Sequence, residues 1–409
     1  MALYTTLPFW SGSMNIKSHK DAPPIRVKRF FWCHDRLSFG EDSHEYFLPC
    51  LGIALFASML AVSLFSQTNL SPDGIFIMIM TYAIAFTLPV FVILSLVIVV
   101  EFLDGLKSLL IAHRHLNYLN NNEILSTFKK AMSILSSHKM PPPTALLKMY
   151  LSHIGYKVFI LQCFVLPLLL TSFTISKITI PHIWGFSWDA YFSSLDHFLF
   201  GDDAWRILHS FIDKNFIDYI ESLYMPLWCT AMFYAPLLVF FSKSTDKRNN
   251  FLLSYCLAWV FCGIILASVF ASAGPVFTHM FDPTLAKHFN PLLPSLRDNL
   301  SEDSVILQSQ QYLAGNYLEI RLGGGISAMP SLHIIIASLY VLFFYKTRYF
   351  WGAIFFLLCI IMGSIYFGYH YAIEAPVCII LALFIWTIAS FIMRTLTNPT
   401  RPPQESLVE

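Results

Sequence analysis

The chain has 409 residues, of which 56% are hydrophobic, 16% aromatic and only 12% charged, with a formal net charge of +1. This composition excludes an ordinary water-soluble domain and indicates a protein of the lipid bilayer. The near-zero net charge, without long runs of like charges, gives no reason to expect nucleic acid as a partner.

Eight apolar segments are predicted to cross the membrane, because a bilayer core about 30 Å thick takes roughly 20 apolar residues in a helix. They follow residues 1–46, a basic tail that lacks the apolar core and small-residue cleavage site of a signal peptide. The predicted fold class is therefore an all-α, polytopic membrane helix bundle. The segments lie near residues 47–66, 76–100, 158–175, 219–241, 251–273, 328–345, 350–367 and 375–393.

The chain divides near residue 157 into an accessory part and a core. Residues 47–157 hold two spans and a link, in which the apolar residues of 123–135 recur at helical spacing and predict a helix on the membrane surface. Residues 158–394 hold the six-span core. Residues 395–409 form a second tail.

The predicted orientation follows from lysine and arginine, which favour the cytoplasmic side of a membrane. With eight spans, every basic connection falls on the same side as the two tails, so both termini are predicted to be cytoplasmic. The basic regions are residues 1–46, 101–157, 243–248 and 346–348, and the C-terminal tail.

The opposite side carries two long connections, residues 176–218 and 274–325. Connections of this length usually bind or cover something. In the first, residues 188–200 mix aromatic and acidic side chains, as expected of a helix that lies in the membrane interface or only closes the rim of the bundle. Asn69-Leu-Ser71 and Asn299-Leu-Ser301 fit glycosylation acceptors on this side. A bacterial inner membrane and a membrane of the secretory pathway both fit the sequence.

Metal and disulfide chemistry are not expected. The chain has eight cysteines, but no two of them form a CxxC pair, and most lie in apolar runs where a thiol acts as a small hydrophobic group. The carboxylates do not recur at metal-ligand spacing either. We therefore expect no metal and no cofactor, and no pattern predicts an oligomeric state.

The first chemistry-bearing segment opens the sixth predicted span. Gly323-Gly-Gly325 supplies backbone that a phosphate can approach closely, Ser327 follows it, and Pro330 is compatible with the first turn of the next helix. The start of such a helix attracts anions through its free N–H groups, and Ser331 adds a hydroxyl donor. His333 then lies where the apolar helix meets water, so the segment predicts a phosphate site beside an imidazole.

The second segment lies between the last two spans, where His370 precedes Glu374 by four residues. If the segment is helical, this spacing permits a contact that orients the imidazole. His370 reaches the height of His333 only if the seventh span stops near Gly363 to Gly368. We therefore predict a break before His370 and a last helix that starts near Glu374.

These two segments resemble signature motifs of a known family. Ser327-Ala-Met-Pro-Ser-Leu-His333 and His370-Tyr-Ala-Ile-Glu374 are similar to the second and third motifs of the type 2 phosphatidic acid phosphatase superfamily. Asp196-His-Phe-Leu-Phe-Gly201 and Ser272-Ala-Gly-Pro-Val-Phe277 further resemble its inositol phosphorylceramide synthase-like branch. The resemblance covers the six-span core and leaves out the first two spans.

The resemblance implies a role for each matched residue. It makes His370 the nucleophile that attacks phosphorus, His333 the general acid that protonates the leaving oxygen, and Glu374 the group that orients His370. Ser331, Ser327, Gly325 and the nearby backbone would bind the phosphate.

The sequence departs from the family pattern in three ways. Leu332 stands where a glycine is usual, Glu374 replaces an aspartate, and Ser364 takes the place of an arginine, while the lysine- and arginine-bearing first motif is missing. We expect Arg321 to supply the missing charge, the alternative being that it only extends to the aqueous rim. Turnover of Arg321→Ala within threefold of wild type would end that hypothesis.

The resulting hypothesis is a membrane lipid phosphatase or phosphotransferase that works through a phosphohistidine on the non-cytoplasmic face. Its partner is a membrane lipid phosphate, such as phosphatidic acid, an isoprenoid pyrophosphate, or phosphatidylinositol with a lipid acceptor. One alternative is an alcohol-accepting transferase like inositol phosphorylceramide synthase. Others are an inactive relative and a non-enzymatic transporter or lipid-binding protein, although no inverted repeat is visible.

Overall fold

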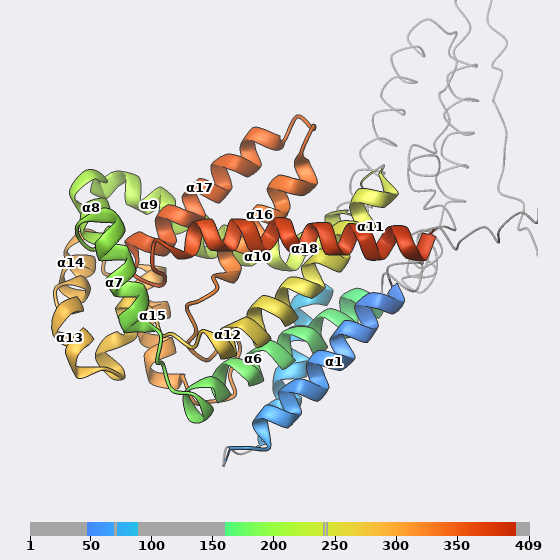
Figure 1. Cartoon of the computed structure of the whole chain (residues 1–409), viewed down its shortest axis with the longest axis horizontal. Coiled ribbons are helices and arrows are strands. Elements are labelled where there is room, and N and C mark those ends of the chain that lie inside the picture. Colours follow the sequence, from blue (N-terminus) through green and yellow to red (C-terminus); the bar gives the residue numbers. More distant parts are fainter. Residues whose placement is uncertain (1–46, 69–71, 89–159, 240–241, 243, 398–409) are drawn as a thin grey trace, which may run out of the picture. The chain divides into compact units, whose positions relative to one another are not determined.

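The computed structural model describes residues 47–68, 72–88, 160–239, 242 and 244–397. Throughout these residues the regular secondary structure is helical, which confirms the predicted all-α class (Figure 1). All of them belong to one compact unit, which spans residues 40–90 and 155–409. The N-terminal tail, residues 398–409 of the C-terminal tail, the end of the second predicted span and the predicted surface helix at 123–135 lie outside the described residues.

The first helix, α1 (Phe47–Phe65), packs along α6 (Leu166–Ile183). The face of α1 that meets its neighbours is lined by the small residues Ala54, Ala57 and Ala61, which let two helix backbones approach closely. Its other face leaves large apolar side chains exposed, as a lipid-facing surface would. A second helix, Ile75–Leu88, joins the pair through a hydrogen bond of 2.8 Å between the Tyr82 and Thr174 hydroxyls.

The third predicted span is longer than expected. A π-helical turn, η2 (Leu161–Val165), runs directly into α6, which continues to Ile183 rather than ending near residue 175. Polar residues interrupt the apolar pattern there, but their hydroxyls bond within the helix: Ser176 donates to the Ser172 carbonyl and Thr179 to the Ser176 carbonyl. The predicted loop therefore begins after the end of α6.

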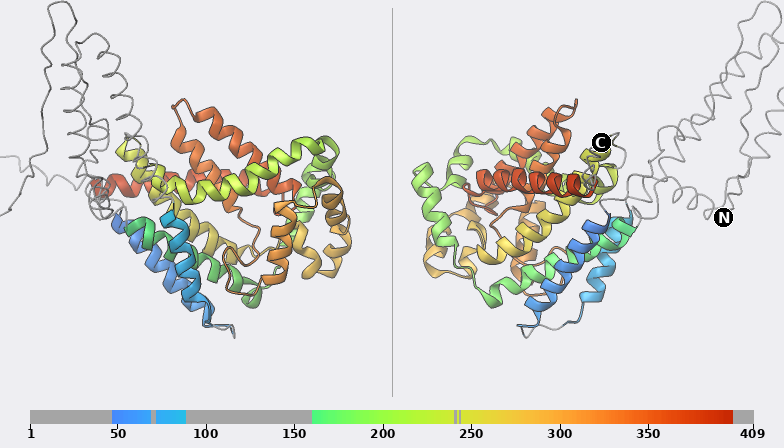
Figure 2. Two further views of the ribbon diagram at one scale, coloured as in Figure 1. Left: turned by 180° about the vertical axis from the view of Figure 1, so that it is seen from behind. Right: turned by 45° about the vertical axis from the view of Figure 1, so that its right-hand side comes forward.

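The remaining predicted spans are also helical. The fourth consists of α9 (Lys214–Ser222), η3 (Leu223–Leu227) and α10 (Trp228–Leu238), and the fifth of α11 (Thr245–Leu257), η5 (Ala258–Leu266) and α12 (Ala267–Val269). Each begins earlier than predicted. The last three are α16 (Leu332–Phe344), α17 (Phe350–Tyr366) and α18 (Glu374–Thr397), and α16 packs against both α17 and α18 (Figures 1 and 2).

Three helical stretches in the described residues are long and apolar enough to cross a membrane, namely Leu161–Ile183, Asp246–Val269 and Glu374–Leu396. Four shorter apolar helices accompany them: Pro49–Phe65, Ile75–Leu88, Leu332–Phe344 and Phe350–Tyr366. These helices are compatible with a membrane protein. The total of eight spans and the division into a six-span core remain predictions.

The two long predicted connections are themselves helical and contact each other. The first contains α7 (Asp189–Phe200) and α8 (Ala204–Phe211), and the second contains η6 (Pro275–Met280), α13 (Pro283–Phe289), α14 (Leu292–Asn299) and α15 (Val305–Asn316). His288 lies 2.7 Å from Asp203, and His209 bonds to Ser295 at 2.7 Å. The two connections therefore lie on the same side of the helices that they join (Figure 1).

Candidate active site

The chain turns sharply before His370, as the sequence predicts. Helix α17 ends at Tyr366, Gly368 adopts a positive φ of 70°, and α18 begins at Glu374. The backbone N–H of His370 donates to the Ser364 carbonyl at 3.1 Å. The turn thus holds the histidine against the end of the helix that precedes it.

Glu374 makes the predicted contact with His370. Its Oε2 lies 3.0 Å from His370 Nδ1, and its Oε1 accepts the Tyr371 N–H at 2.9 Å. The expected helical basis of this contact is wrong, because residues 370–373 form a turn and the fully buried Glu374 reaches back from the first position of α18. A carboxylate at Nδ1 keeps a proton on that nitrogen, which leaves the lone pair of Nε2 free.

His333 brings a second imidazole to the same place. It lies in the first turn of α16, and its ring centroid is 5.9 Å from that of His370. The Tyr224 and Trp228 rings flank it at 5.0 and 4.1 Å. The two histidine rings are thus adjacent, as predicted, and the two flanking aromatic rings restrict the rotation of the His333 ring.

The segment Ser272–Phe277 connects the two motif loops. The Ala328 N–H donates to the Ser272 carbonyl at 2.9 Å, and the Met329 N–H to the Ser272 hydroxyl at 3.0 Å. On the other side, the Val276 N–H donates to the Gly368 carbonyl at 2.9 Å. This short segment, whose second half is the start of η6, therefore joins the loops of His333 and His370.

Gly274 is required within this connecting segment. Its φ is 88°, and an added Cβ would lie only 2.2 Å from the Tyr369 carbonyl oxygen. We expect Gly274→Ala to destabilise the protein by about 3 kcal/mol or more, measured as a lower thermal midpoint and a poor yield of folded protein. Gly352→Ala is the matched control, since nothing lies within 4 Å of an added Cβ there. Equal stability of the two variants would contradict this packing.

Two buried aspartates hold the turn of His370, and sequence reasoning missed their role. Asp196 accepts the Ala372 N–H at 2.6 Å and the Ile373 N–H at 2.9 Å. Asp189 accepts the N–H groups of Ala273 and Gly274 and the Tyr371 hydroxyl, each through bonds of 2.8 to 2.9 Å. The acids of α7 therefore face the interior of the protein, while its aromatic Phe198 is 82% exposed. Their spacing of seven residues, two helical turns, is the sequence pattern that could have indicated this shared face.

Burial raises the pKa of Asp189 and of Asp196 from 3.8 to about 6, although their backbone hydrogen bonds act in the opposite direction. The nearby charges on Glu374, which faces both aspartates, and on Asp203, which faces Asp196, raise these pKa values further. Because the folded state binds these protons more tightly than the unfolded chain, its stability should fall as the pH rises from about 4 to about 6, then level off.

We expect the thermal midpoint of the wild type to fall over that pH range. In Asp196→Asn the fall should be smaller, because the variant lacks one of the two titrating groups. Thermal unfolding at closely spaced pH values measures both slopes. An unchanged slope in Asp196→Asn would show that Asp196 does not titrate there.

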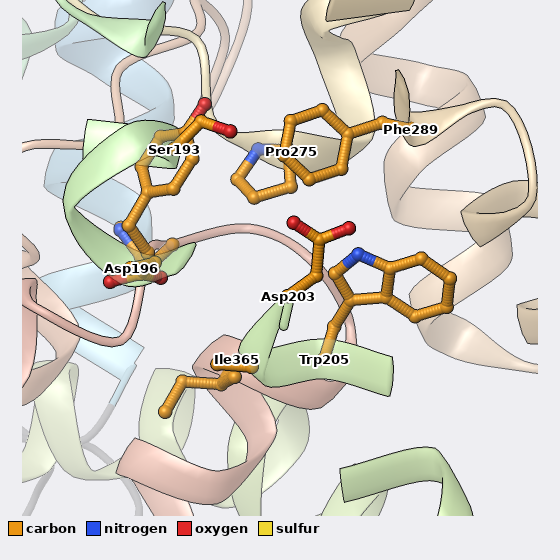
Figure 3. A pocket seen from close by; sticks show the side chains of 10 residues that line it. Ser193, Asp196, Asp203, Trp205, Pro275, Phe289 and Ile365 are labelled. Atoms are coloured by element: carbon orange, nitrogen blue, oxygen red, sulfur yellow. The ribbon is translucent and has the colours of Figure 1, made fainter. Parts of the chain in front are cut away.

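A narrow cleft adjoins His370 on the side of the aspartates. It is lined by Asp196, Asp203, Trp205 and Phe289 among others, and Figure 3 shows the Asp203 carboxylate between the Trp205 ring and Phe289. Asp203 is already held by His288 and by Arg206, whose Nε lies 3.1 Å away. The cleft has room for about one water molecule. A head group does not fit in it, so a phosphate has to reach the histidines from another side.

The predicted phosphate-binding residues do not all lie in equivalent surroundings. Ser331 caps α16, fully buried, and its hydroxyl has no hydrogen-bond partner among the described residues. Pro330 precedes this cap, so it lies outside the first turn in which it was expected. Ser327 is partly buried, whereas Arg321 is more than half exposed and pairs with Glu319 at 2.6 Å.

The glycine run packs against other helices. The Gly323 N–H donates to the Tyr82 hydroxyl at 3.2 Å, which joins this loop to the second helix of the chain. Gly325 adopts a φ of 81°, and an added Cβ would lie 2.9 Å from Lys177 Cγ and 3.0 Å from the Ile178 nitrogen. The missing side chain at position 325 therefore lets the loop close directly onto α6.

Lys177 is a third residue whose position sequence reasoning missed. The predicted span ended before it, which assigned it to a loop, whereas α6 carries it beside the loop of His333. Its ammonium group lies 5.8 Å from the centre of the Phe173 ring. The residues around Lys177 are apolar or carry small hydroxyl groups, so they can continue the helix of the span before it. This pattern could have indicated its position.

No group of three histidine, cysteine or carboxylate side chains in the described part of the chain could hold a metal ion. The acids near His370 are instead bound to backbone N–H groups or to histidine. In general, an imidazole bound to a carboxylate through Nδ1 can act as a nucleophile through Nε2, and a neighbouring imidazole can carry a proton.

Comparison with known proteins gives one family. The model of the PAP2 superfamily matches residues 190–388, which include both histidines, Glu374 and Asp196 but leave out Lys177. No curated protein and no solved structure matches the chain. Residues 190–388, slightly less than half of the chain, are thus similar to the PAP2 superfamily, whose members are phosphatases or phosphotransferases.

Proposed function

We propose that this protein is an integral membrane lipid phosphatase or phosphotransferase that works through a phosphohistidine on His370. The observation that carries the proposal is the pair of imidazoles 5.9 Å apart, one of them bound through Nδ1 to a buried carboxylate. Two rings at this separation can face the two sides of one phosphorus atom, as an in-line displacement requires.

The first half-reaction forms a bond between His370 Nε2 and phosphorus and breaks the bond between phosphorus and the lipid oxygen. His333 donates its proton to that oxygen, which leaves as an alcohol. Glu374 stabilises the positive charge that develops on the His370 ring. No metal takes part in this sequence of steps.

The second half-reaction regenerates the histidines. His333, now neutral, takes a proton from the acceptor, whose oxygen attacks phosphorus while the N–P bond breaks. With water as acceptor the product is free phosphate, and with an alcohol it is a new phosphate ester. Resemblance of Asp196–Gly201 and Ser272–Phe277 to the inositol phosphorylceramide synthase-like branch favours an alcohol, and both segments contact the motif loops.

The proposed topology has eight spans, both termini in the cytoplasm and the histidines near the non-cytoplasmic face. It is supported by the seven apolar helices and by the two helical connections that lie on one side of them. In this arrangement the tails of the substrate lie between spans, and its phosphate reaches the histidines from the rim. A bacterial inner membrane and a secretory-pathway membrane both satisfy it.

Turnover by the purified protein in lipid vesicles tests the proposal. Vesicles that contain phosphatidic acid should release inorganic phosphate, and vesicles with phosphatidylinositol and a lipid alcohol should form a new phosphodiester. Both reactions should vanish in His370→Ala. Release without transfer identifies a phosphatase, and transfer identifies a phosphotransferase. Neither reaction with any lipid phosphate, from a folded wild-type protein, would favour a transporter or lipid-binding protein.

A further inference from the structure

Phosphoryl transfer builds negative charge on the oxygens around phosphorus, and an enzyme needs a positive group to stabilise it. The surroundings of His370 work against such charge, because Glu374, Asp189 and Asp196 are all buried near its turn. Arg321, the cation expected from the sequence, is exposed and already neutralised by Glu319. The proposed reaction therefore requires a cation from another part of the protein.

Lys177 lies where such a cation is needed. The loop that leads to His333 rests on it, because Gly325 allows the backbone to approach within contact of the Lys177 side chain. Its ammonium group lies 5.8 Å from the centre of the Phe173 ring, and the Phe173 ring meets Leu332, the residue before His333, at Gly263. Within the described residues, no carboxylate pairs with it.

The start of α16 offers further groups for an anion at the same loop. The first hydrogen bond of the helix runs from the Ile335 N–H to the Ser331 carbonyl. The N–H groups of the first three helical residues, 332–334, therefore have no acceptor inside the helix. The Ser331 hydroxyl is fully buried and unpartnered among the described residues. Within the described residues, a lysine and a buried hydroxyl that both lack a hydrogen-bond or ion-pair partner thus lie at the loop of His333, and they form the elements of an oxyanion site.

We propose that Lys177 binds the non-bridging oxygens of the phosphoryl group and stabilises their charge in the transition state, with the Ser331 hydroxyl as a second donor. This assignment rests on the proposed function, and it places the phosphoryl group at the loop of His333, where Gly325 packs on α6. That place carries the positive charge of Lys177, whereas the cleft beside the aspartates carries negative charge and repels a phosphate. It also gives Lys177 the role that the sequence suggested for Arg321.

A purely structural reading is that Lys177 only extends its amine toward the aqueous rim of the membrane. The two readings differ in what removal of the charge does. A charged group held in an apolar helix without a partner destabilises the fold, so Lys177→Met, which keeps the length of the side chain, should be at least as stable as wild type. A catalytic role predicts that this stable variant is nearly inactive.

The experiment compares Lys177→Met, Lys177→Arg and the control Lys287→Met, which removes one exposed lysine of α13. We expect Lys177→Met to lower kcat/KM for a lipid phosphate by about 10²- to 10³-fold. Inhibition by orthovanadate, a mimic of the pentavalent phosphoryl group, should weaken by a similar factor. Lys177→Arg should recover part of both effects, and Lys287→Met should behave as wild type.

Two results would overturn the assignment. One is a Lys177→Met protein with turnover and vanadate inhibition within threefold of wild type. The other is loss of vanadate inhibition in Arg321→Ala but not in Lys177→Met. If turnover persists in His370→Ala, the proposed function itself fails. If turnover depends on His370 but not on Lys177, only the assignment of Lys177 fails.

Discussion

Glu374→Gln is expected to lower turnover by about 10⁴-fold while the protein remains folded. Glutamine has nearly the shape of glutamate, and its carbonyl oxygen can still accept the Tyr371 N–H that Glu374 Oε1 accepts now. Its amide nitrogen then faces His370 Nδ1, which at present lies 3.0 Å from Glu374 Oε2. Two donors cannot face each other, so the proton of the ring moves to Nε2. The nitrogen that should attack phosphorus then has no free lone pair.

Kinetics and unfolding together test this account. Steady-state turnover of Glu374→Gln should fall while its thermal midpoint stays within a few degrees of the wild-type value. Glu374→Asp is the informative second variant, because it keeps the charge but shortens the side chain, and it should recover part of the activity. If the glutamine variant kept a tenth of the wild-type rate or more, orientation of His370 by Glu374 would not matter to the reaction.

His333→Ala is expected to lose about 10²- to 10⁴-fold in turnover of a lipid phosphate, because the leaving alkoxide no longer receives a proton. The loss should depend on the leaving group. An aryl phosphate such as 4-nitrophenyl phosphate departs as a stable anion and needs no proton, so its first half-reaction should proceed nearly as in wild type. The second half-reaction still needs a base, so the phosphohistidine should accumulate.

A burst experiment separates these steps. With 4-nitrophenyl phosphate, His333→Ala should release one nitrophenolate per enzyme rapidly and then nearly stop, whereas wild type should continue. Phe211→Ala is a suitable control, because this residue lies 80% exposed in α8, outside the proposed site. Equal losses for the lipid and the aryl ester would contradict a role of His333 as general acid.

The all-α class and the proximity of His333 and His370 could be predicted from the sequence, because both depend on local patterns. The break before His370 follows from Gly363 and Gly368, and the structure confirms it with the positive φ of Gly368 and the start of α18 at Glu374. The proximity of His333 and His370 follows because the break before His370 brings both residues to the same depth along the bundle axis. Span ends were predicted less well, since hydroxyl residues such as Ser176 and Thr179 interrupt the apolar pattern but satisfy their hydrogen bonds within the helix.

The supporting groups were beyond prediction because they act through contacts distant in the sequence. Asp196 bonds to the backbone of Ala372 and Ile373, and Asp189 bonds to Gly274 and Tyr371. A sequence shows that α7 is amphipathic, but in a membrane protein the polar face can turn inward. Only the packing decides between a helix whose acids face water and one whose acids hold the turn of His370.

The most direct test of the central claim is to find the phosphoryl group on His370. The purified protein, incubated briefly with a ³²P-labelled lipid phosphate and then denatured in alkali, should retain label that is lost in acid, as a phosphoramidate bond requires. Peptide mapping should place the label at His370, and the label should be absent from His370→Ala. With ³²P-labelled 4-nitrophenyl phosphate, whose leaving group needs no proton, the label should accumulate in His333→Ala. Label on any other residue, or turnover without a labelled intermediate in wild type and His333→Ala alike, would contradict the account.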